Sequence, residues 1–179
     1  GGLVADEMGL GKTILMIGTM ISNFLTRTLI VVPLALMDQW YSEIFRTTGH
    51  KALIYHGAMK KSIEIEELQK APIVITTYGQ IKCKKDSRDK KMLHHLKWDR
   101  VLFDEGHHLR NSNTQNWIGA KRLDAGIRWL ITGTPIQNRK SDFYSLCDIM
   151  GYKKEFYMDD TNLMALVRAS ILKRCKAEV

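Results

Sequence analysis

The residues of this sequence that are best suited to chemistry lie in two short stretches far apart in the chain. The first spans residues 6–13 and reads Asp-Glu-Met-Gly-Leu-Gly-Lys-Thr. Its glycines let backbone N–H groups turn toward a polyphosphate, and Lys12 adds a full positive charge beside a helix N-terminus. Thr13 supplies a hydroxyl that suits Mg²⁺. The general P-loop pattern has glycine where this chain has Asp6, so these residues alone also fit a glycine-bearing turn before an ordinary helix.

The second stretch is an acidic pair, Asp104-Glu105, which follows the apolar run Val101-Leu102-Phe103. Adjacent carboxylates at the carboxyl end of an apolar strand, downstream of a P-loop, form a Walker B arrangement. Asp104 would hold Mg²⁺, and Glu105 would orient and deprotonate an attacking water. Taken alone, the pair could equally cap the helix that follows. Two halves of one Mg-nucleotide site in the right order favour the nucleotide interpretation.

Alternating strands and helices must position these two stretches. Short apolar, β-branched runs predict strands at residues 3–5, 28–32, 52–55, 73–76, 101–105 and 128–132. Helical spacing of apolar residues predicts helices at 14–25, 34–45, 60–70, 141 (or 140)–150 and 163–167. This alternation predicts an α/β fold, a central and mostly parallel sheet with helices on both faces. Such sheets bind ligands at the carboxyl ends of their strands, where both stretches fall.

Composition narrows the class of protein. A chain of 179 residues is long enough for one domain with a sizeable core. The net charge of +8 fits either a polyanionic partner or a basic soluble enzyme. No apolar run reaches bilayer length, so we expect no membrane partner. Cys83, Cys147 and Cys175 lack metal-ligand spacing, which indicates a reducing compartment.

Residue chemistry alone does not decide the role of three further segments. Residues 82–97 are dense in charge and predict either a solvated surface insertion or a direct polyanion contact. Residues 133–138 gather hydroxyls and amides after a strand, and could couple the nucleotide site to a second site or simply form a turn. Lys173, Arg174 and Lys176 form a basic tail. The chain begins on a glycine inside its first strand, so we expect it to be part of a longer protein.

The joint pattern resembles one family, the Swi/Snf-type ATPases of helicase superfamily two. Residues 2–13 resemble that family's motif I, the Walker A element, and the family itself has an acid at the position of Asp6. Asp104-Glu105-Gly106-His107 is similar to its Asp-Glu-Ala-His (DEAH) box, with glycine in the alanine place. The remaining matches are Leu29 to Trp40 with motif Ia, Ile73 to Tyr78 with motif Ib, Leu130 to Asn138 with motif III, and Ile171 to Lys176 with the segment that leaves the first lobe. The glycine in the box, with Arg110-Asn111, leans toward the branch of helicase-like transcription factors and post-replication-repair ATPases.

The resemblance implies that residues 1–179 are the N-terminal RecA-like lobe of a two-lobed ATP hydrolase. Such enzymes are stimulated by double-stranded DNA and translocate on it, moving nucleosomes or stripping proteins in chromatin remodelling, transcription or DNA repair. We therefore expect ATP and Mg²⁺ as cofactors, DNA and a second lobe as partners, and a nuclear location for a eukaryotic or viral parent, otherwise a cytoplasmic one.

The resemblance also assigns roles to individual residues. The nucleotide-binding set is Asp6, Glu7, Met8, Gly9, Leu10, Gly11, Lys12 and Thr13, and the metal ligands are Thr13 and Asp104. The catalytic set is Lys12, Asp104, Glu105 and His107. Coupling between hydrolysis and DNA grip falls to Thr132, Gly133 and Thr134. Candidates near the DNA backbone are Pro33, Thr76, Thr77, Arg110 and Asn138.

Two parts of the family's machinery are expected outside this sequence. The glutamine motif that contacts adenine would precede Gly1, and the second lobe with its arginine finger would follow Val179. We therefore predict that the 179 residues alone hydrolyse ATP barely or not at all. An RNA helicase lobe of the same superfamily and a non-catalytic scaffold with the same fold are the alternatives. Both are disfavoured, the first by the contexts of motifs I and III and the second by the presence of Lys12, Asp104 and Glu105.

Overall fold

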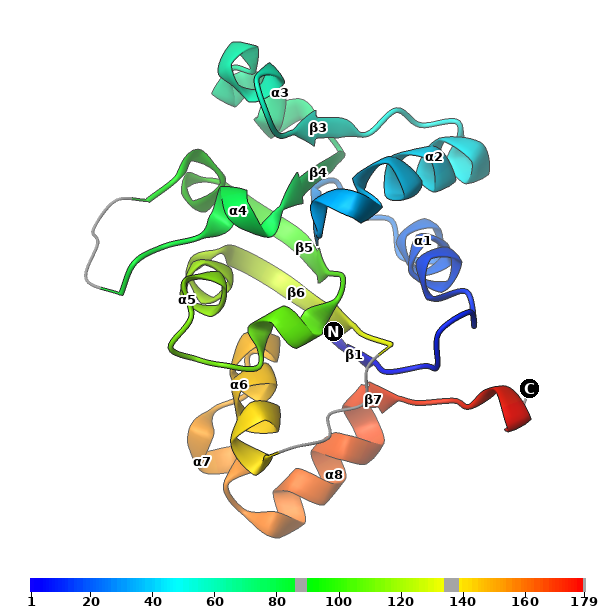
Figure 1. The fold of residues 1–179 in the computed structure, drawn as a ribbon, viewed down its shortest axis with the longest axis vertical. Helices are drawn as coiled ribbons and strands as arrows, with labels where there is room; N and C mark the ends of the chain where they lie inside the picture. The colour runs from blue at the N-terminus through cyan, green and yellow to red at the C-terminus, as the bar shows by residue number, and fades with distance from the viewer. Residues whose placement is uncertain (86–89, 134–138, 179) are drawn as a thin grey trace.

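A computed structural model describes residues 1–85, 90–133 and 139–178, and within them seven strands form one parallel sheet (Figure 1). The strand order is β3-β4-β2-β5-β6-β1-β7. The strands are β1 (Gly2–Val4), β2 (Thr28–Val32), β3 (Leu53–Tyr55), β4 (Ile73–Thr77), β5 (Lys97–Phe103), β6 (Asp124–Ile131) and β7 (Ile171–Leu172). All six predicted strands are present within a few residues of their predicted bounds, and β7 is an addition.

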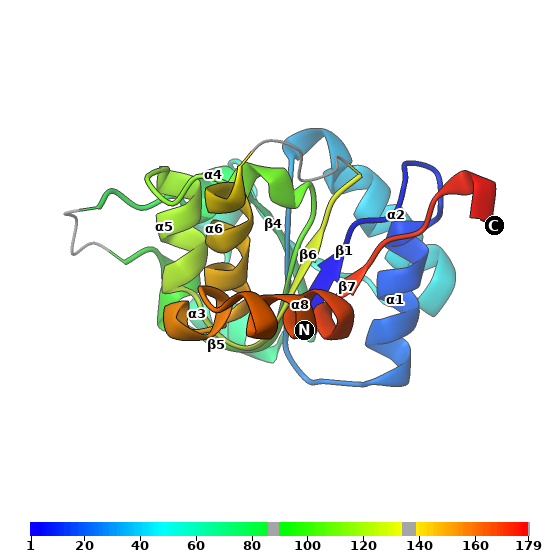
Figure 2. The same cartoon turned by 90° about the horizontal axis from the view of Figure 1, so that it is seen from below.

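Helices cover both faces of the sheet, as predicted (Figure 2). Helices α1 (Lys12–Ser22) and α2 (Met37–Thr48) pack on one face. The other face carries α3 (Ile65–Lys70), α4 (Tyr78–Ile81), α5 (Gln115–Arg122) and α6 (Lys140–Met150). Two further helices, α7 (Lys154–Tyr157) and α8 (Asp160–Ser170), pack against α6 through a small separate cluster of Cys147, Tyr157 and Leu166. Short 3₁₀ turns connect these elements: η1 (Leu34–Leu36), η2 (Met59–Ser62), η3 (Met92–His95), η4 (Gly106–Leu109) and η5 (Lys176–Glu178).

The sequence of β2 shows why the centre of the sheet needs continuous apolar runs. Leu29 and Val31 pack into the cluster on one face, and Ile30 and Val32 into the cluster on the other. All four side chains have no exposed surface. A central parallel strand is covered on both faces, so its residues read as an unbroken hydrophobic run instead of an alternating one.

The basic tail predicted at residues 173–176 follows a short strand of the sheet. Strand β7 pairs in parallel with β1, with Leu3 opposite Ile171. Backbone bonds continue this pairing past both strands, from Ala5 N to Leu172 O and from Glu7 N to Arg174 O. Residues 173–176 therefore run beside the loop that follows β1.

The prediction of a solvated insertion at residues 82–97 fits the exposed residues of the described part of this segment, but four of its residues are buried. Cys83, Leu93, His94 and Leu96 are buried, and residues 86–89 lie outside the described residues. The reason is that η3 turns its apolar side chains under the sheet, where the indole N–H of Trp98 donates to the Leu93 carbonyl. In the described part of the chain, no helix combines the length and the apolar character needed to cross a bilayer.

Candidate functional site

The loop between β1 and α1 has the backbone that a phosphate-binding loop needs. Gly9 and Gly11 adopt φ values of 88° and 70°, in the left-handed region that side chains disfavour. Helix α1 begins immediately afterwards at Lys12, so its free N–H groups point into the loop. The Lys12 ammonium donates to the backbone carbonyls of Asp6 (3.0 Å) and Glu7 (3.2 Å), which holds it over the same loop.

The side chain of Asp6 points away from the loop opening and is completely buried. Its Oδ2 accepts from Nη2 (2.5 Å) and Nε (3.1 Å) of Arg174, and its Oδ1 accepts from the backbone N–H of Arg174 (2.9 Å). The neighbouring Glu7 carboxylate accepts from the backbone N–H of Lys176 (2.7 Å). The side chains of Asp6 and Glu7 therefore anchor the loop to the C-terminal segment, and the buried Asp6 can contact a nucleotide only through its backbone.

Asp104 lies just beyond the end of β5 and is held by three different groups. Its Oδ2 accepts from the indole N–H of Trp40 (2.7 Å), and its Oδ1 accepts from the backbone N–H of Glu105 (2.8 Å). The hydroxyl of Tyr78 donates to its backbone carbonyl (2.6 Å). Burial raises the pKa of Asp104, and the hydrogen bonds from Trp40 and Glu105 oppose that rise. The carboxylate is thus removed from water, but protein donors replace part of its hydration.

Glu105 has an unusual backbone. At φ 51° and ψ 50° it is the one non-glycine residue with positive φ among those the structure describes. Such a conformation costs on the order of 1 to 3 kcal/mol and occurs preferentially at functional sites. Next to it, Nδ1 of His107 lies 3.0 Å from Glu105 Oε2, close enough for an ion pair with a protonated imidazole, although this nitrogen makes no hydrogen bond. At Gly106 an added Cβ would meet Leu130 at an ordinary 3.4 Å, so the site has room for the alanine of the related box.

The two predicted stretches meet in one pocket of about 330 Å³ at the carboxyl edge of the sheet. Its walls include Lys12 and Thr13 from one stretch and Asp104 and Glu105 from the other, together with Met8, Gly9, Gly11, Ile14, Leu36, Gln39 and Glu43. The prediction that the ends of the first and fifth strands meet at one edge is therefore confirmed, with β6 lying between them.

The segment after β6 also approaches the loop. Thr132 is buried, and its N–H donates to the carbonyl of Val4 at the end of β1. A Cβ on Gly133 would stand 3.2 Å from Lys12 Nζ, so this glycine borders the lysine directly. Thr134 and Asn138 lie outside the described residues.

The candidate DNA contacts divide by exposure. The side chain of Thr76 is fully buried and its hydroxyl donates to the Tyr55 carbonyl (2.8 Å), so it is not exposed at the surface of this lobe. Thr77 is nearly buried and its hydroxyl lies 3.1 Å from His56 Nδ1. Pro33 and Arg110 are partly exposed, after β2 and η4. Pro33, Thr77 and Arg110 thus lie at or beyond the carboxyl ends of three neighbouring strands, β2, β4 and β5.

Sequence reasoning missed three residues of this site: Trp40, Tyr78 and Arg174. Trp40 and Tyr78 closed the matches to motifs Ia and Ib without a role, and Arg174 was counted as tail. Trp40 and Tyr78 donate to Asp104, which is 64 and 26 residues away in sequence. Arg174 donates to Asp6, which is 168 residues away. No local pattern carries such pairings.

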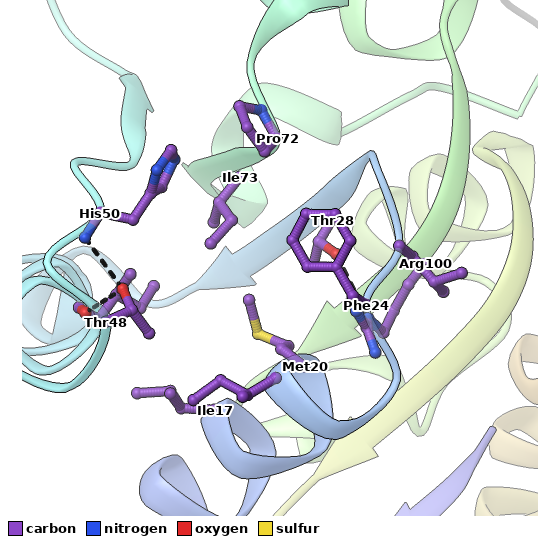
Figure 3. Close-up of a pocket in the computed structure, with 12 residues that line it drawn as sticks. Ile17, Met20, Phe24, Thr28, Thr48, His50, Pro72, Ile73 and Arg100 are labelled. Carbon is purple, nitrogen blue, oxygen red and sulfur yellow. Dashed lines mark hydrogen bonds between the residues drawn. The ribbon is translucent and has the colours of Figure 1, made fainter.

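A second hollow lies at the opposite, amino edge of the sheet (Figure 3). It has a volume of about 270 Å³ between the C-terminal halves of α1 and α2, and is mostly apolar, with Met20, Phe24 and Ile73 in its wall. The guanidinium of Arg100 is engaged by Thr28 and by backbone carbonyls of Thr19 and Asn23. This hollow contains no acidic residue and is separated from the P-loop by the length of the strands, so it is not the nucleotide pocket.

Comparison with known proteins agrees with this geometry. Residues 1–159 match the model of the SNF2-related domain. The chain is 35% identical to the DNA repair protein rad8 of Schizosaccharomyces pombe over 86% of its own length and 16% of that protein. It is 37% identical to the ATP-dependent DNA helicase DDM1 of Arabidopsis thaliana, over 83% of its length and 20% of that protein. The chain thus spans a fifth or less of these relatives.

A solved structure shows the same fold. The SWI2/SNF2 ATPase core of Sulfolobus solfataricus in complex with double-stranded DNA superposes with a TM-score of 0.77 and 28% identity, covering 98% of this chain and 40% of that one. Sheet, loop and acidic pair together with these matches lead to one assignment: the chain belongs to the SNF2-related domain family and has the RecA-like fold of the SWI2/SNF2 ATPase core.

Proposed function

We propose that this chain is the first, ATP-binding lobe of a DNA-dependent ATPase that translocates on double-stranded DNA. The observation that carries the proposal is the single pocket that brings Lys12 and Thr13 together with Asp104 and Glu105. A positively charged loop at a helix N-terminus suits a polyphosphate, and the acids across the pocket suit a metal ion and a water.

The groups present fit Mg²⁺. The Thr13 hydroxyl and the Asp104 carboxylate are hard oxygen donors of the kind that Mg²⁺ prefers, and both line the same pocket. When bound, the ion supplies charge neutralisation on the phosphate oxygens. Lys12 and the N–H groups of residues 9–13 bind phosphate, and Glu105 orients the water and accepts its proton. His107, whose Nδ1 lies 3.0 Å from Glu105 Oε2, would pair with that carboxylate when protonated.

Double-stranded DNA is the proposed polyanionic partner. The Sulfolobus relative was solved with that ligand, and this chain has a net charge of +8. Pro33, Thr77 and Arg110 lie together at the edge of the sheet that also carries the nucleotide pocket, which places a backbone contact close to the hydrolytic residues. Contacts of this kind bind phosphates, so binding is expected to tolerate any sequence and to weaken with salt.

The rest of the machinery is proposed to lie in a longer parent protein. A second RecA-like lobe would close over the pocket and supply an arginine finger, worth about 10³- to 10⁵-fold in rate in related P-loop enzymes. The isolated chain should therefore bind ATP but hydrolyse it barely or not at all. Nucleosomes as substrate and the nucleus as location follow from the same proposal for a eukaryotic or viral parent.

The test is nucleotide binding by the chain itself. Isothermal titration with ATP and Mg²⁺ should show binding that Lys12→Ala weakens about 10- to 100-fold, the scale of one lost charge-assisted hydrogen bond. Lys70→Ala, on the exposed end of α3, is the matched control and should bind as wild type does. Equal affinity of wild type and Lys12→Ala would refute the proposal. In the parent protein, stronger ATPase stimulation by RNA than by duplex DNA would refute the choice of partner.

A further inference from the structure

Trp40 makes a contact that core packing does not require. It lies in α2, has 1% of its surface exposed, and is among the largest fully buried side chains of the described residues. Its indole N–H points at Asp104 Oδ2, at a donor–acceptor distance of 2.7 Å. This acceptor is an ionisable side chain that lines the nucleotide pocket.

A second buried tryptophan shows the ordinary alternative. Trp98 is also completely buried, and its indole N–H donates to the backbone carbonyl of Leu93 at 3.0 Å. That bond satisfies a donor inside the core and touches no pocket residue. Buried indoles generally find such a partner, so a bond to a backbone carbonyl needs no further explanation. Trp40 differs because its bond determines which way a carboxylate points.

The geometry around Asp104 makes the Trp40 bond decisive. Oδ1 of Asp104 accepts from the N–H of Glu105, a bond to the adjacent residue. Oδ2 has Trp40 as its donor, so the two bonds together fix the rotation of the carboxylate about its side-chain torsions. Without the indole N–H, one oxygen would lose its buried partner and the carboxylate could turn about the remaining bond.

Helix α2 also connects this carboxylate to the surroundings of the pocket. Gln39 and Glu43, on either side of Trp40 in sequence, line the nucleotide pocket. Helix α2 is preceded by the 3₁₀ turn η1, which begins just after Pro33. A displacement of α2 would therefore move the indole that holds Asp104.

We propose that Trp40 is a positioning residue that orients the Asp104 carboxylate toward the Mg²⁺ of a bound nucleotide. This inference rests on the proposed function, because it assigns a metal-orienting role within that same pocket. Groups that orient a metal ligand from behind typically contribute about 10- to 100-fold to metal affinity or activity.

The test compares nucleotide binding with and without Mg²⁺. The probe is the non-hydrolysable ATP analogue AMP-PNP, titrated into the chain in EDTA and again in Mg²⁺. Trp40→Phe should leave affinity in EDTA unchanged and reduce the gain from Mg²⁺ about 10-fold or more. Trp98→Phe, the matched control, should keep the full gain. Replacing Trp40 with 3-benzothienylalanine, which keeps the ring shape and lacks the N–H, should reproduce Trp40→Phe and removes any effect of lost packing.

The outcomes separate the two proposals. If Mg²⁺ raises the AMP-PNP affinity of the benzothienyl variant as much as that of the wild type, the role of Trp40 is overturned and the proposed function stands. Equal losses in EDTA and in Mg²⁺ overturn it as well, because a purely structural effect would not distinguish the two conditions. Absence of AMP-PNP binding by the wild type overturns the proposed function, and with it this inference.

Discussion

Gly119→Ala should destabilise the chain even though alanine is the better helix former. Gly119 lies within α5, where an added Cβ would stand 1.8 Å from the carbonyl oxygen of Ile81 and 2.6 Å from its carbon. Ordinary van der Waals contact begins at 3.4 Å, so α5 and α4 would have to separate by more than an ångström. The clash is with backbone, which cannot rotate away as a flexible side chain could.

The expected magnitude follows from two opposing terms. Replacing glycine with alanine inside a helix raises the free energy of unfolding by about 1 kcal/mol. Overpacking a rigid core costs about 1 to 3 kcal/mol, occasionally more, and a backbone clash of this size belongs at or beyond the upper end. We therefore expect Gly119→Ala to lower the free energy of unfolding by about 2 kcal/mol.

Gly18 provides the matched control for the same substitution. It is exposed within α1, and a Cβ there would meet nothing within 4 Å. Gly18→Ala should therefore raise the free energy of unfolding by about 1 kcal/mol.

Urea unfolding and thermal melts of both variants measure this contrast. For a chain of this size 1 kcal/mol corresponds to about 2 to 4 °C in Tm, so Gly119→Ala should melt about 4 to 8 °C lower and Gly18→Ala about 2 to 4 °C higher. A Gly119→Ala protein as stable as Gly18→Ala would refute the packing of α5 on α4 described above.

Two further predictions concern buried ionisable side chains, His94 and Asp6. Burial lowers the pKa of His94 below its usual value of 6.5, so the unfolded chain takes up a proton first as pH falls. The stability present above about pH 6.5 should therefore be lost as pH falls toward the folded-state pKa. His94→Gln should flatten that part of the urea-midpoint profile between about pH 7.5 and about pH 5, whereas the exposed His95→Gln keeps it. Arg174→Gln removes the cation that faces the buried Asp6 carboxylate, so it should lower both the Tm and the affinity for ATP. Adding Asp6→Asn should restore much of both, and a double variant worse than the single one would contradict the pairing.

The sheet was predictable because its signal is local. The central strand Thr28–Val32 is apolar after its first residue, and burial on both faces leaves few other interpretations. Helix α5 was not predicted, because its eight residues include glycine, asparagine and two cations and show little periodicity. Its start is set by Thr114, whose hydroxyl accepts from the Trp117 N–H. Strand β7 was not predicted either, because two residues are too few to form a recognisable strand pattern and its stability comes from pairing with β1.

The candidate site shows the same division. Residue types and order predicted that a P-loop and an acidic pair lie at one edge of the sheet, since parallel strands carry their carboxyl ends to the same side. The sequence could not show the left-handed backbone of Glu105, because a glutamate has no preference for that region and tertiary contacts must impose it. The burial of Thr76 was equally hidden, because a threonine at the end of a strand is polar by type and its actual exposure depends on β3 beside it.

The acid at the first position of the loop has a physical explanation that reconciles it with phosphate binding. A carboxylate pointing into a phosphate site would repel the ligand, but that of Asp6 points underneath the loop and accepts three hydrogen bonds from Arg174. Its charge is compensated there by the guanidinium, so little of it acts on the pocket. Its backbone carbonyl meanwhile faces the other way and accepts from Lys12. Asp6 thus links the phosphate-binding lysine to the C-terminal segment, and a movement of residues 171–176 relative to β1 would act on the loop through Asp6 and its neighbour Glu7.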